Sequence, residues 1–278
     1  MKIEVLLENE AIDKRVKPKH GLSILVKTNG KTILFDTGPD KTYLENAQKL
    51  EVQLDCIDSI VISHGHIDHL GGLKYFPKIN NLEKVVLAET AFDKYWIKLG
   101  PFYKNIGVNK VKYSNVVEKF CFISNNYRLY DNVYVLMCKN IKECESVSIM
   151  SSNLFEGDLK NPDDFHHELI MVIKEDGKLF VFTGCSHSGI LNIIKLVEKN
   201  FDEPIKAIIG GFHLIGLPYL NTLSASKKEI EILADRLLSK KVETYYSCHC
   251  TGPKAFEIMY PIMKGRLISI KTGSQILI

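Results

Sequence analysis

Short runs of apolar and β-branched residues, separated by polar turns, dominate the first part of the chain. This pattern predicts strands over residues 3–7, 22–28, 31–35, 57–63 and 85–87. The dipeptide Asn29-Gly30 separates the second run from the third and favours a tight hairpin between them. Residues 43–50 place apolar side chains at helical spacing, so we expect a helix there, packed against the strands.

The second part of the chain repeats this logic, with longer helical segments between the strands. The predicted strands are residues 169–173, 179–182, 207–209 and 243–246. The predicted helices cover residues 188–199 and 224–240. The tail, residues 267–278, predicts a short hairpin around Thr272-Gly273. Alternation of strands and helices in both parts predicts an α/β fold with helices packed outside two sheets.

Residues 89–166 give the weakest pattern, with several aromatic side chains and clusters of Asn and Asp. The aromatic residues are Phe92, Tyr95, Trp96, Phe102 and Tyr103. Because no linker rich in Gly, Pro or Ser interrupts the chain, we expect residues 1–278 to form a single domain with an insertion or lid within 89–166. The aromatic residues either shape a substrate pocket or pack this lid against the core.

Composition narrows the class of protein. The 278 residues, 45% hydrophobic and 25% charged, are sufficient for a large packed core. The net charge of +3 gives no argument for a nucleic-acid partner, and no apolar run approaches the length of a membrane span. The seven cysteines lack regular spacing, which favours reduced thiols and a cytoplasmic location.

The most informative stretch is residues 60–73, an apolar strand followed by three histidines, an aspartate and a Gly-Gly pair. Its potential ligands are His64, His66, Asp68 and His69. Imidazole and carboxylate groups suit zinc and neighbouring divalent metals. Because the chain can turn at Gly65, the first two side chains can meet at one ion and the last two at a second. One loop can therefore hold two metal ions.

Three further histidines follow apolar strands: His187, His213 and His249. A glycine turn precedes the first two of them. Ligand sites of open sheets lie at the carboxyl ends of the strands, so these histidines and the loop at 64–69 are expected to meet at one rim. His213 is a candidate ligand, proton donor or substrate contact. His166 and His167 are interpreted as residues of a surface loop.

Several other kinds of site are excluded by their missing motifs. The cysteines around His249 do not make a structural zinc site, because no Cys-x-x-Cys pair is present. The chain also lacks a Gly-rich phosphate loop of the Walker or Rossmann kind, and a Gly-x-Ser-x-Gly nucleophile turn.

His-x-His-x-Asp-His after an apolar strand resembles the signature of the metallo-β-lactamase superfamily, and Leu34-Phe35-Asp36-Thr37-Gly38 resembles the turn after that family's second strand. The resemblance implies an αββα four-layer sandwich with one or two divalent metal ions, used mostly for hydrolysis. Zinc is the default ion by ligand type, and iron and manganese accept the same imidazole and carboxylate groups.

The resemblance also implies roles for residues of the second half. Cys185, in Thr183-Gly184-Cys185, stands where family members usually have an aspartate that bridges two metals, so it either ligates as a thiolate or merely lines the site. For the third histidine of the first metal, the candidates are the loop at 165–169 and His187, and we favour His187. Ser186 begins a helical turn whose free backbone donors suit substrate binding. His249 matches the family's last ligand.

Four blocks, residues 63–73, 183–194, 210–214 and 248–252, resemble one branch more closely. That branch includes archaeal 7,8-dihydropterin-6-yl-methyl-4-(β-D-ribofuranosyl)aminobenzene 5′-phosphate synthases. The resemblance implies either a hydrolase or a transferase that releases pyrophosphate.

For the hydrolase, we expect a metal-activated hydroxide to attack a phosphorylated or ester-type small molecule. Asp68 would orient or deprotonate the attacking water, and His213 would protonate the leaving group. A non-catalytic ligand sensor on the same fold is the third alternative, and the intact cluster at 64–69 argues against it.

Overall fold

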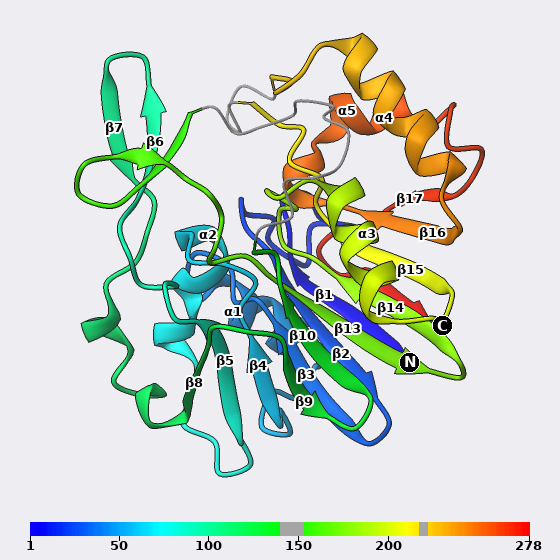
Figure 1. Cartoon of the computed structure of the whole chain (residues 1–278). Helices are drawn as coiled ribbons and strands as arrows, with labels where there is room; N and C mark the ends of the chain where they lie inside the picture. The colour runs from blue at the N-terminus through cyan, green and yellow to red at the C-terminus, as the bar shows by residue number, and fades with distance from the viewer. Residues whose placement is uncertain (140–152, 217–221) are drawn as a thin grey trace.

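A computed structural model describes residues 1–139, 153–216 and 222–278. Two large sheets stack face to face, each of seven strands (Figure 1). The first sheet consists, in spatial order, of β18 (Gln275–Leu277), β1 (Lys2–Leu7), β2 (Ser23–Thr28), β3 (Lys31–Phe35), β4 (Ser59–Val61), β5 (Lys84–Ala88) and β8 (Phe120–Ile123). The second consists of β17 (Leu267–Ser269), β16 (Val242–Ser247), β15 (Ile205–Gly210), β14 (Lys178–Phe182), β13 (Leu169–Glu175), β10 (Val133–Met137) and β9 (Tyr127–Tyr130).

The main core lies between the two sheets. Alternate residues of β3, Ile33 and Phe35, face this core, and the ring of Phe35 lies 6.1 Å from the ring of Phe182 on the opposite sheet. Leu34, between them, packs against the helices on the outer face instead. Both faces of these strands are therefore buried, which explains why the sequence shows continuous apolar runs instead of alternation with polar residues.

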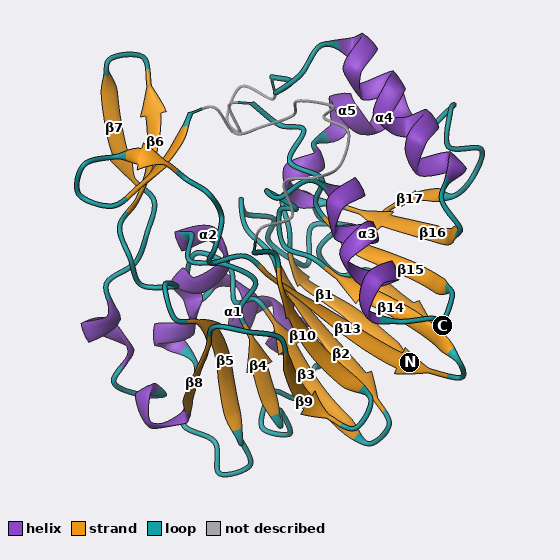
Figure 2. Cartoon of the chain, in the orientation of Figure 1, coloured by secondary structure: helices purple, strands orange, loops and turns teal. Residues whose placement is uncertain are grey.

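Helices cover the outer faces of both sheets (Figure 2). The first sheet is covered by α1 (Thr42–Lys49), by the short α2 (Ile67–Leu70) and by the 3₁₀ turn Gly71–Tyr75. The second is covered by α3 (Ile190–Asn200), α4 (Lys227–Ser239) and α5 (Pro253–Met259). Further 3₁₀ turns are Lys110–Tyr113, Val117–Lys119 and His249–Thr251. This confirms the αββα sandwich. Among the described helices, none is long and apolar enough to cross a membrane.

In each large sheet, four neighbouring strands that include one edge strand run parallel to one another. β3, β4, β5 and β8 are parallel to one another, as are β14, β15, β16 and β17. Parallel strands place their carboxyl ends at one edge, so the loops that follow β3, β4, β14, β15 and β16 gather at the same end of the sandwich. The histidine-rich segments of the sequence lie in these loops.

Residues 89–166 contribute strands to all three sheets of the structure. A third, small sheet consists of β12 (Asn161–Pro162), β11 (Leu154–Glu156), β6 (Tyr95–Leu99) and β7 (Phe102–Asn105), and it projects from the sandwich in Figure 1. β8 joins the first large sheet, and β9 and β10 join the second, because the chain crosses between the sheets here. Residues 140–152 of the predicted insertion lie outside the described residues, and a lid role stays a prediction.

The predicted hairpin in the tail is wrong. β17 pairs in parallel with β16 of the second sheet, whereas β18 pairs antiparallel with β1 of the first. The turn at Thr272-Gly273 thus carries the chain from one sheet to the other. Each strand finds an established neighbour with more apolar surface than a two-stranded ribbon offers, and local turn chemistry does not outweigh that gain.

Candidate metal centre

The loop between β4 and α2 carries His64 and His66, and α2 carries Asp68 and His69. Close backbone packing fixes the path of this loop. A Cβ atom at Gly65 would lie 2.4 Å from the carbonyl oxygen of Ala91 and 2.7 Å from the Tyr95 ring, so no side chain fits there. The backbone N–H of Ile67 donates to the carbonyl of Ile106, 2.7 Å away. The loop is therefore held against the segment that leads into β6 and out of β7.

The structure brings the strand-end histidines together at one rim. The ring centroids of His64 and His187 lie 4.9 Å apart, and those of His187 and His213 lie 4.3 Å apart. The Nε2 atoms of His69 and His249, which are far apart in sequence, lie within 3.1 Å. Loops from both large sheets thus enclose one site.

Cys185 lies at the centre of this site, and two of the sets of potential ligands to which it belongs contain histidines of the ligand loop or α2. In one set its sulfur lies with ring nitrogens of His64 and His187, and in the other with those of His69 and His249, all within 4.8 Å of one another. The Cys185 Sγ atom is 3.3 Å from His69 Nε2. The thiol therefore occupies the position between the two sets, which is where a bridging ligand would lie.

Asp68 extends the second set, and His66 lies beside the first. Asp68 Oδ2 is 3.6 Å from His69 Nε2, 3.4 Å from His249 Nε2 and 3.2 Å from His20 Nε2. The ring of His66 lies 5.0 Å from that of His187. His20 lies in the segment between β1 and β2, and this segment brings its ring to the site.

The donor set fits one or two divalent ions. The Nε2 atoms of His64 and His66 are buried and have no hydrogen-bond partner among the described residues. A buried polar atom without a partner carries a desolvation cost of about 1–3 kcal/mol, which a bound ion would remove. Two buried nitrogen atoms without hydrogen bonds, on neighbouring residues, are the kind of donors that a metal site requires.

Burial keeps most of these imidazoles neutral, the form that binds metal. It lowers the pKa of His64 well below the ordinary value, and the charges of the neighbouring histidines lower it further. His187 shows the same direction of pKa shift from the same causes. Burial raises the pKa of the Asp68 carboxyl, but His69 and the hydrogen bonds of His20 and His249 outweigh it, so that Asp68 stays ionised.

A buried carboxylate orients His69 from behind. Asp36, directly after β3, lies 2.7 Å through Oδ2 from His69 Nδ1, and it also accepts hydrogen bonds from the backbone N–H and the hydroxyl of Ser63, each at 2.7 Å. Burial lowers the pKa of His69, but the charges of Asp68 and Asp36 outweigh it and raise this pKa to about 9. With Nδ1–H donated to Asp36, Nε2 is left facing Cys185 and His249.

Hydrogen bonds with polar side chains also position His249 and His187, and the sequence did not reveal these contacts. Asn9 Oδ1 lies 3.0 Å from His249 Nδ1, and Glu8 Oε2 accepts from the His249 backbone N–H at 3.1 Å. Glu168 accepts the backbone N–H groups of His187 and Ser188 at 2.7 and 2.8 Å. The signal that could have found these groups is an acidic residue directly beside a buried strand.

Glu168 also corrects the expectation for the start of α3. The backbone donors around Ser186 were expected to be free for substrate, but two of them already bind the Glu168 carboxylate. The Ser186 hydroxyl donates to the carbonyl of Gly211 at 2.7 Å and lies 3.0 Å from the Thr183 hydroxyl. These polar groups hold the turn that presents Cys185, and the helix itself begins only at Ile190.

Four residues at the rim adopt backbone angles that non-glycine residues rarely use. Their φ values lie between 50° and 59°, and they are Asp36, Ser186, His213 and His249. Such conformations cost about 1–3 kcal/mol each and persist only where the surrounding structure imposes them, which is common at functional sites. Their presence at this rim supports its interpretation as the candidate functional site.

His167 is not the surface residue that the sequence predicted. It is 1% exposed, and its ring stacks on Tyr95 with 4.0 Å between centroids. Its Nδ1 accepts the Gly65 backbone N–H at 2.9 Å, so Nε2 carries the proton and donates to Asp163 at 3.2 Å. Because both of its nitrogens have partners, we interpret His167 as a support of the ligand loop, although its ligand atom also lies within 4.8 Å of those of His66 and Asp163. The ligand role of His187 stays a prediction. His166 is partly exposed, as expected.

Replacing Asp163 with Ala should weaken metal binding about 10- to 100-fold, the usual cost of losing a group that orients ligands. Without this acceptor, His167 loses the partner that keeps the proton on Nε2. Its Nδ1 is then no longer fixed as the acceptor of the Gly65 backbone N–H. Asp164→Ala is a matched control, because each aspartate accepts a backbone N–H two residues ahead, at 2.8 and 3.0 Å. Competition against a chromophoric chelator measures both variants, and equal affinities would contradict the supporting role.

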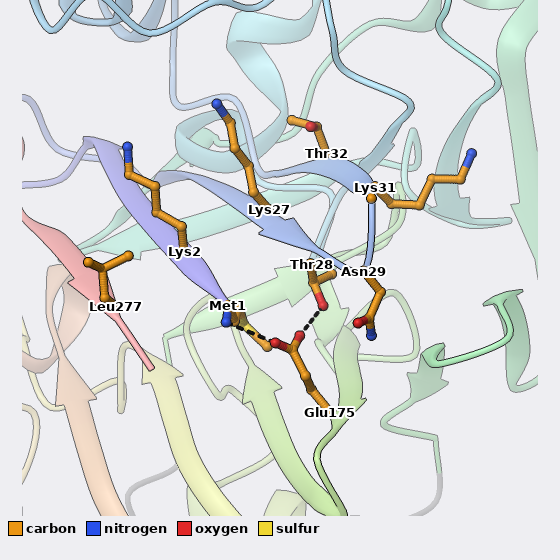
Figure 3. A pocket seen from close by; sticks show the side chains of 10 residues that line it. Met1, Lys2, Lys27, Thr28, Asn29, Lys31, Thr32, Glu175 and Leu277 are labelled. Atoms are coloured by element: carbon orange, nitrogen blue, oxygen red, sulfur yellow. Dashed lines mark hydrogen bonds and ion pairs between the residues drawn. The ribbon is translucent and has the colours of Figure 1, made fainter.

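Two hollows of the surface lie at different distances from the candidate site. The hollow in Figure 3, about 470 Å³, lies near Met1, Thr28 and Glu175, at the end of the sandwich opposite Asp36. A second hollow of about 460 Å³ is lined by Ile67 and Gly71 and lies directly beside the ligand loop. The second is the one within reach of the candidate site.

An αββα sandwich with this ligand cluster at its rim defines a class of metal-dependent enzymes. The family model of the metallo-β-lactamase superfamily matches residues 16–119. The chain is 31% identical over 260 residues to the 7,8-dihydropterin-6-methyl-4-(β-D-ribofuranosyl)-aminobenzene-5′-phosphate synthase of Methanocaldococcus jannaschii, covering 85% of this chain and 82% of the relative. An uncharacterized protein of the same organism is 29% identical, covering 91% of both chains.

Among solved structures, Tm1679, a metal-dependent hydrolase of the β-lactamase superfamily, is similar with a TM-score of 0.82 and 29% identity, covering 100% of this chain and 99% of that one. The chain belongs to the metallo-β-lactamase superfamily.

Proposed function

We propose that this protein is a metal-dependent hydrolase that acts on a phosphorylated or ester-type small molecule. The observation that carries the proposal is the pair of buried Nε2 atoms of His64 and His66, neither of which makes a hydrogen bond within the described residues, with Cys185 beside His64. The chain belongs to a superfamily that includes Tm1679, a structurally similar protein that is a metal-dependent hydrolase. Buried acceptors of this kind suit a bound cation better than a structural role.

The residues divide into two ligand sets. His64, His66 and His187 would hold one ion, and Asp68, His69 and His249 a second, with Cys185 shared between them. Imidazole, carboxylate and thiol donors together favour zinc. Ions bound there would lower the pKa of water and polarise a phosphoryl or carbonyl oxygen.

Two residues are placed to move or orient protons. Asp68 is ionised, lies at the rim, and can accept a hydrogen bond from an attacking water and fix its direction. His213 is half-buried beside His187 and can donate a proton to a leaving group on the open side. The substrate would be a small, phosphate-bearing molecule. The protein would act without a nucleic-acid or membrane partner.

A transferase that releases pyrophosphate is the second candidate. The 31% identity to the pterin-linked synthase over most of both chains favours it. In that reaction the aryl substrate is the nucleophile in place of water, so Asp68 would have no water to orient. His213 would instead face the departing pyrophosphate.

Turnover assays on the metal-loaded chain separate these functions. We expect zinc-loaded protein to hydrolyse at least one phosphodiester, phosphomonoester or lactone, and to lose that activity on chelation. Pyrophosphate release that requires both a dihydropterin pyrophosphate and an aryl ribofuranosyl phosphate would favour the synthase instead. Bound ions without turnover of either class would indicate a sensor, and full activity after chelation would end the metal-dependent proposal.

A further inference from the structure

A second thiol lies next to Cys185 and is not used by either ligand set described above. Cys250 follows β16, Cys185 follows β14, and His213 follows β15, the strand between them. Ligand atoms of these three residues lie within 4.8 Å of one another. Three adjacent parallel strands thus each deliver one soft or borderline donor to a single point.

The fold makes room for the Cys250 sulfur and fixes its position. A Cβ atom at Gly211 would lie 2.3 Å from this sulfur, so the residue there must be glycine. The backbone N–H of His213 donates to Cys250 Sγ at 3.3 Å, and the Cys250 carbonyl accepts from Leu214 and Ile215, each at 2.9 Å. The surrounding backbone therefore holds the Cys250 sulfur in a defined position.

Both sulfurs are buried and reduced. Cys185 and Cys250 are 4% and 3% exposed, and each is a free thiol. The Cys250 S–H donates to the Cys185 carbonyl at 3.4 Å, so the two residues already contact each other. Two thiols held this closely in a buried site form a face that attracts thiophilic ions.

His213 supplies the third donor. Its Nδ1 is buried and has no hydrogen-bond partner among the described residues, although part of the side chain is exposed. Its backbone φ of 50° is one that non-glycine residues rarely adopt. A ring nitrogen of His213 lies within 4.8 Å of both sulfurs, so the imidazole can complete a set of three donors.

We propose that Cys185, His213 and Cys250 form an additional cation position that takes a thiophilic divalent ion, with the Cys185 thiolate shared with the neighbouring ligand sets. In tetrahedral zinc sites, metal–sulfur and metal–nitrogen distances are about 2.3 and 2.0 Å, so ligand atoms lie roughly 3.5–3.8 Å apart. The observed spread of at most 4.8 Å needs only small side-chain rotations to close. The position selects zinc, cadmium, cobalt or iron(II) against magnesium and calcium, which prefer oxygen ligands.

Absorption spectroscopy with Cd²⁺ and Co²⁺ as probes tests the proposal on the full chain. Protein stripped of metal under reducing conditions should develop sulfur-to-metal charge-transfer bands on titration. In Cys250→Ser we expect the band to fall to about half and one bound ion per chain to be lost. Cys121→Ser, a half-buried thiol on β8, is the control and should match the wild type.

Two further measurements keep the test independent of folding and of turnover. In unmodified protein, Cd²⁺ should slow alkylation of Cys250 far more than alkylation of Cys121, as peptide mapping can follow. In His66→Ala, which removes an imidazole ligand, the part of the band that depends on Cys250 should remain. Neither readout requires hydrolase activity, so the position can exist even if the proposed function fails.

Some outcomes would overturn the proposal. If Cys250→Ser keeps the full band and the full number of bound ions, Cys250 is not a ligand. If Cd²⁺ leaves the alkylation of Cys250 unchanged, the same conclusion follows. A Cys185–Cys250 disulfide in protein isolated under reducing conditions would show that the pair is a covalent cross-link instead of a cation position.

Discussion

His66→Ala is expected to remove metal binding at the first ligand set and to lower kcat/KM for any hydrolysed substrate by well over 100-fold. Loss of a group that merely orients a ligand costs about 10- to 100-fold, and loss of the ligand itself must cost more. His66 is buried in the turn at Gly65, and its Nε2 makes no hydrogen bond within the described residues, with the Asp163 carboxylate 3.9 Å away. Ion content after dialysis and steady-state kinetics measure the two effects together.

His166→Ala is the control for this variant. It deletes an imidazole of the same size from a partly exposed position, where the ring contacts only Asp164 among the described residues. We expect wild-type ion content and kinetics there. If His66→Ala kept full activity with no bound metal, the reaction would not depend on this loop, and the hydrolase proposal would fail with it.

The sequence predicted which histidines lie together at the rim, because that signal is local. A candidate ligand at the end of a buried strand follows an apolar run, so His64, His187, His213 and His249 could each be singled out from a few neighbouring residues. Open sheets place such ends at one edge, which made their convergence a geometric expectation. Local apolar runs also identified most strands of the sandwich, because strands that are buried on both faces consist of continuous apolar residues.

The supporting contacts of the site could not be predicted, because they join distant segments of the chain. Glu8 supports His249 across 241 positions, and His167 supports Gly65 across 102. His167 follows no apolar strand, so its surroundings in the sequence resemble an exposed loop. Only the packing of β6 against the ligand loop, with Tyr95 stacked on the imidazole, buries it.

The tail failed for the same reason. A glycine turn between two short apolar runs is the local signature of a hairpin, and the sequence offers no sign that the runs belong to different sheets. β1 and β16 are longer neighbours whose edges would otherwise be unpaired, and they capture β18 and β17. Competition between local and tertiary pairing decides such short strands.

Asp36→Asn should weaken metal binding at the second ligand set about 10- to 100-fold through the tautomer of His69. In the neutral ring that binds metal, the carboxylate accepts from His69 Nδ1 at 2.7 Å, which leaves the lone pair of Nε2 facing Cys185 and His249. An amide that keeps its oxygen on the Ser63 backbone N–H turns its NH₂ group toward Nδ1. The proton then moves to Nε2, and that nitrogen can no longer bind an ion.

Nitrogen NMR of the metal-free variant reports the tautomer directly, and chelator competition reports the affinity. Asp58→Asn is the control, because Asp58 also accepts a backbone N–H at 2.7 Å, from Thr32, at the far end of the same sheet. We expect the control to keep the wild-type affinity. If Asp36→Asn shifted the tautomer without weakening binding, His69 would orient the site and not ligate. If it changed neither, the Asp36 carboxylate would serve only the turn at Ser63.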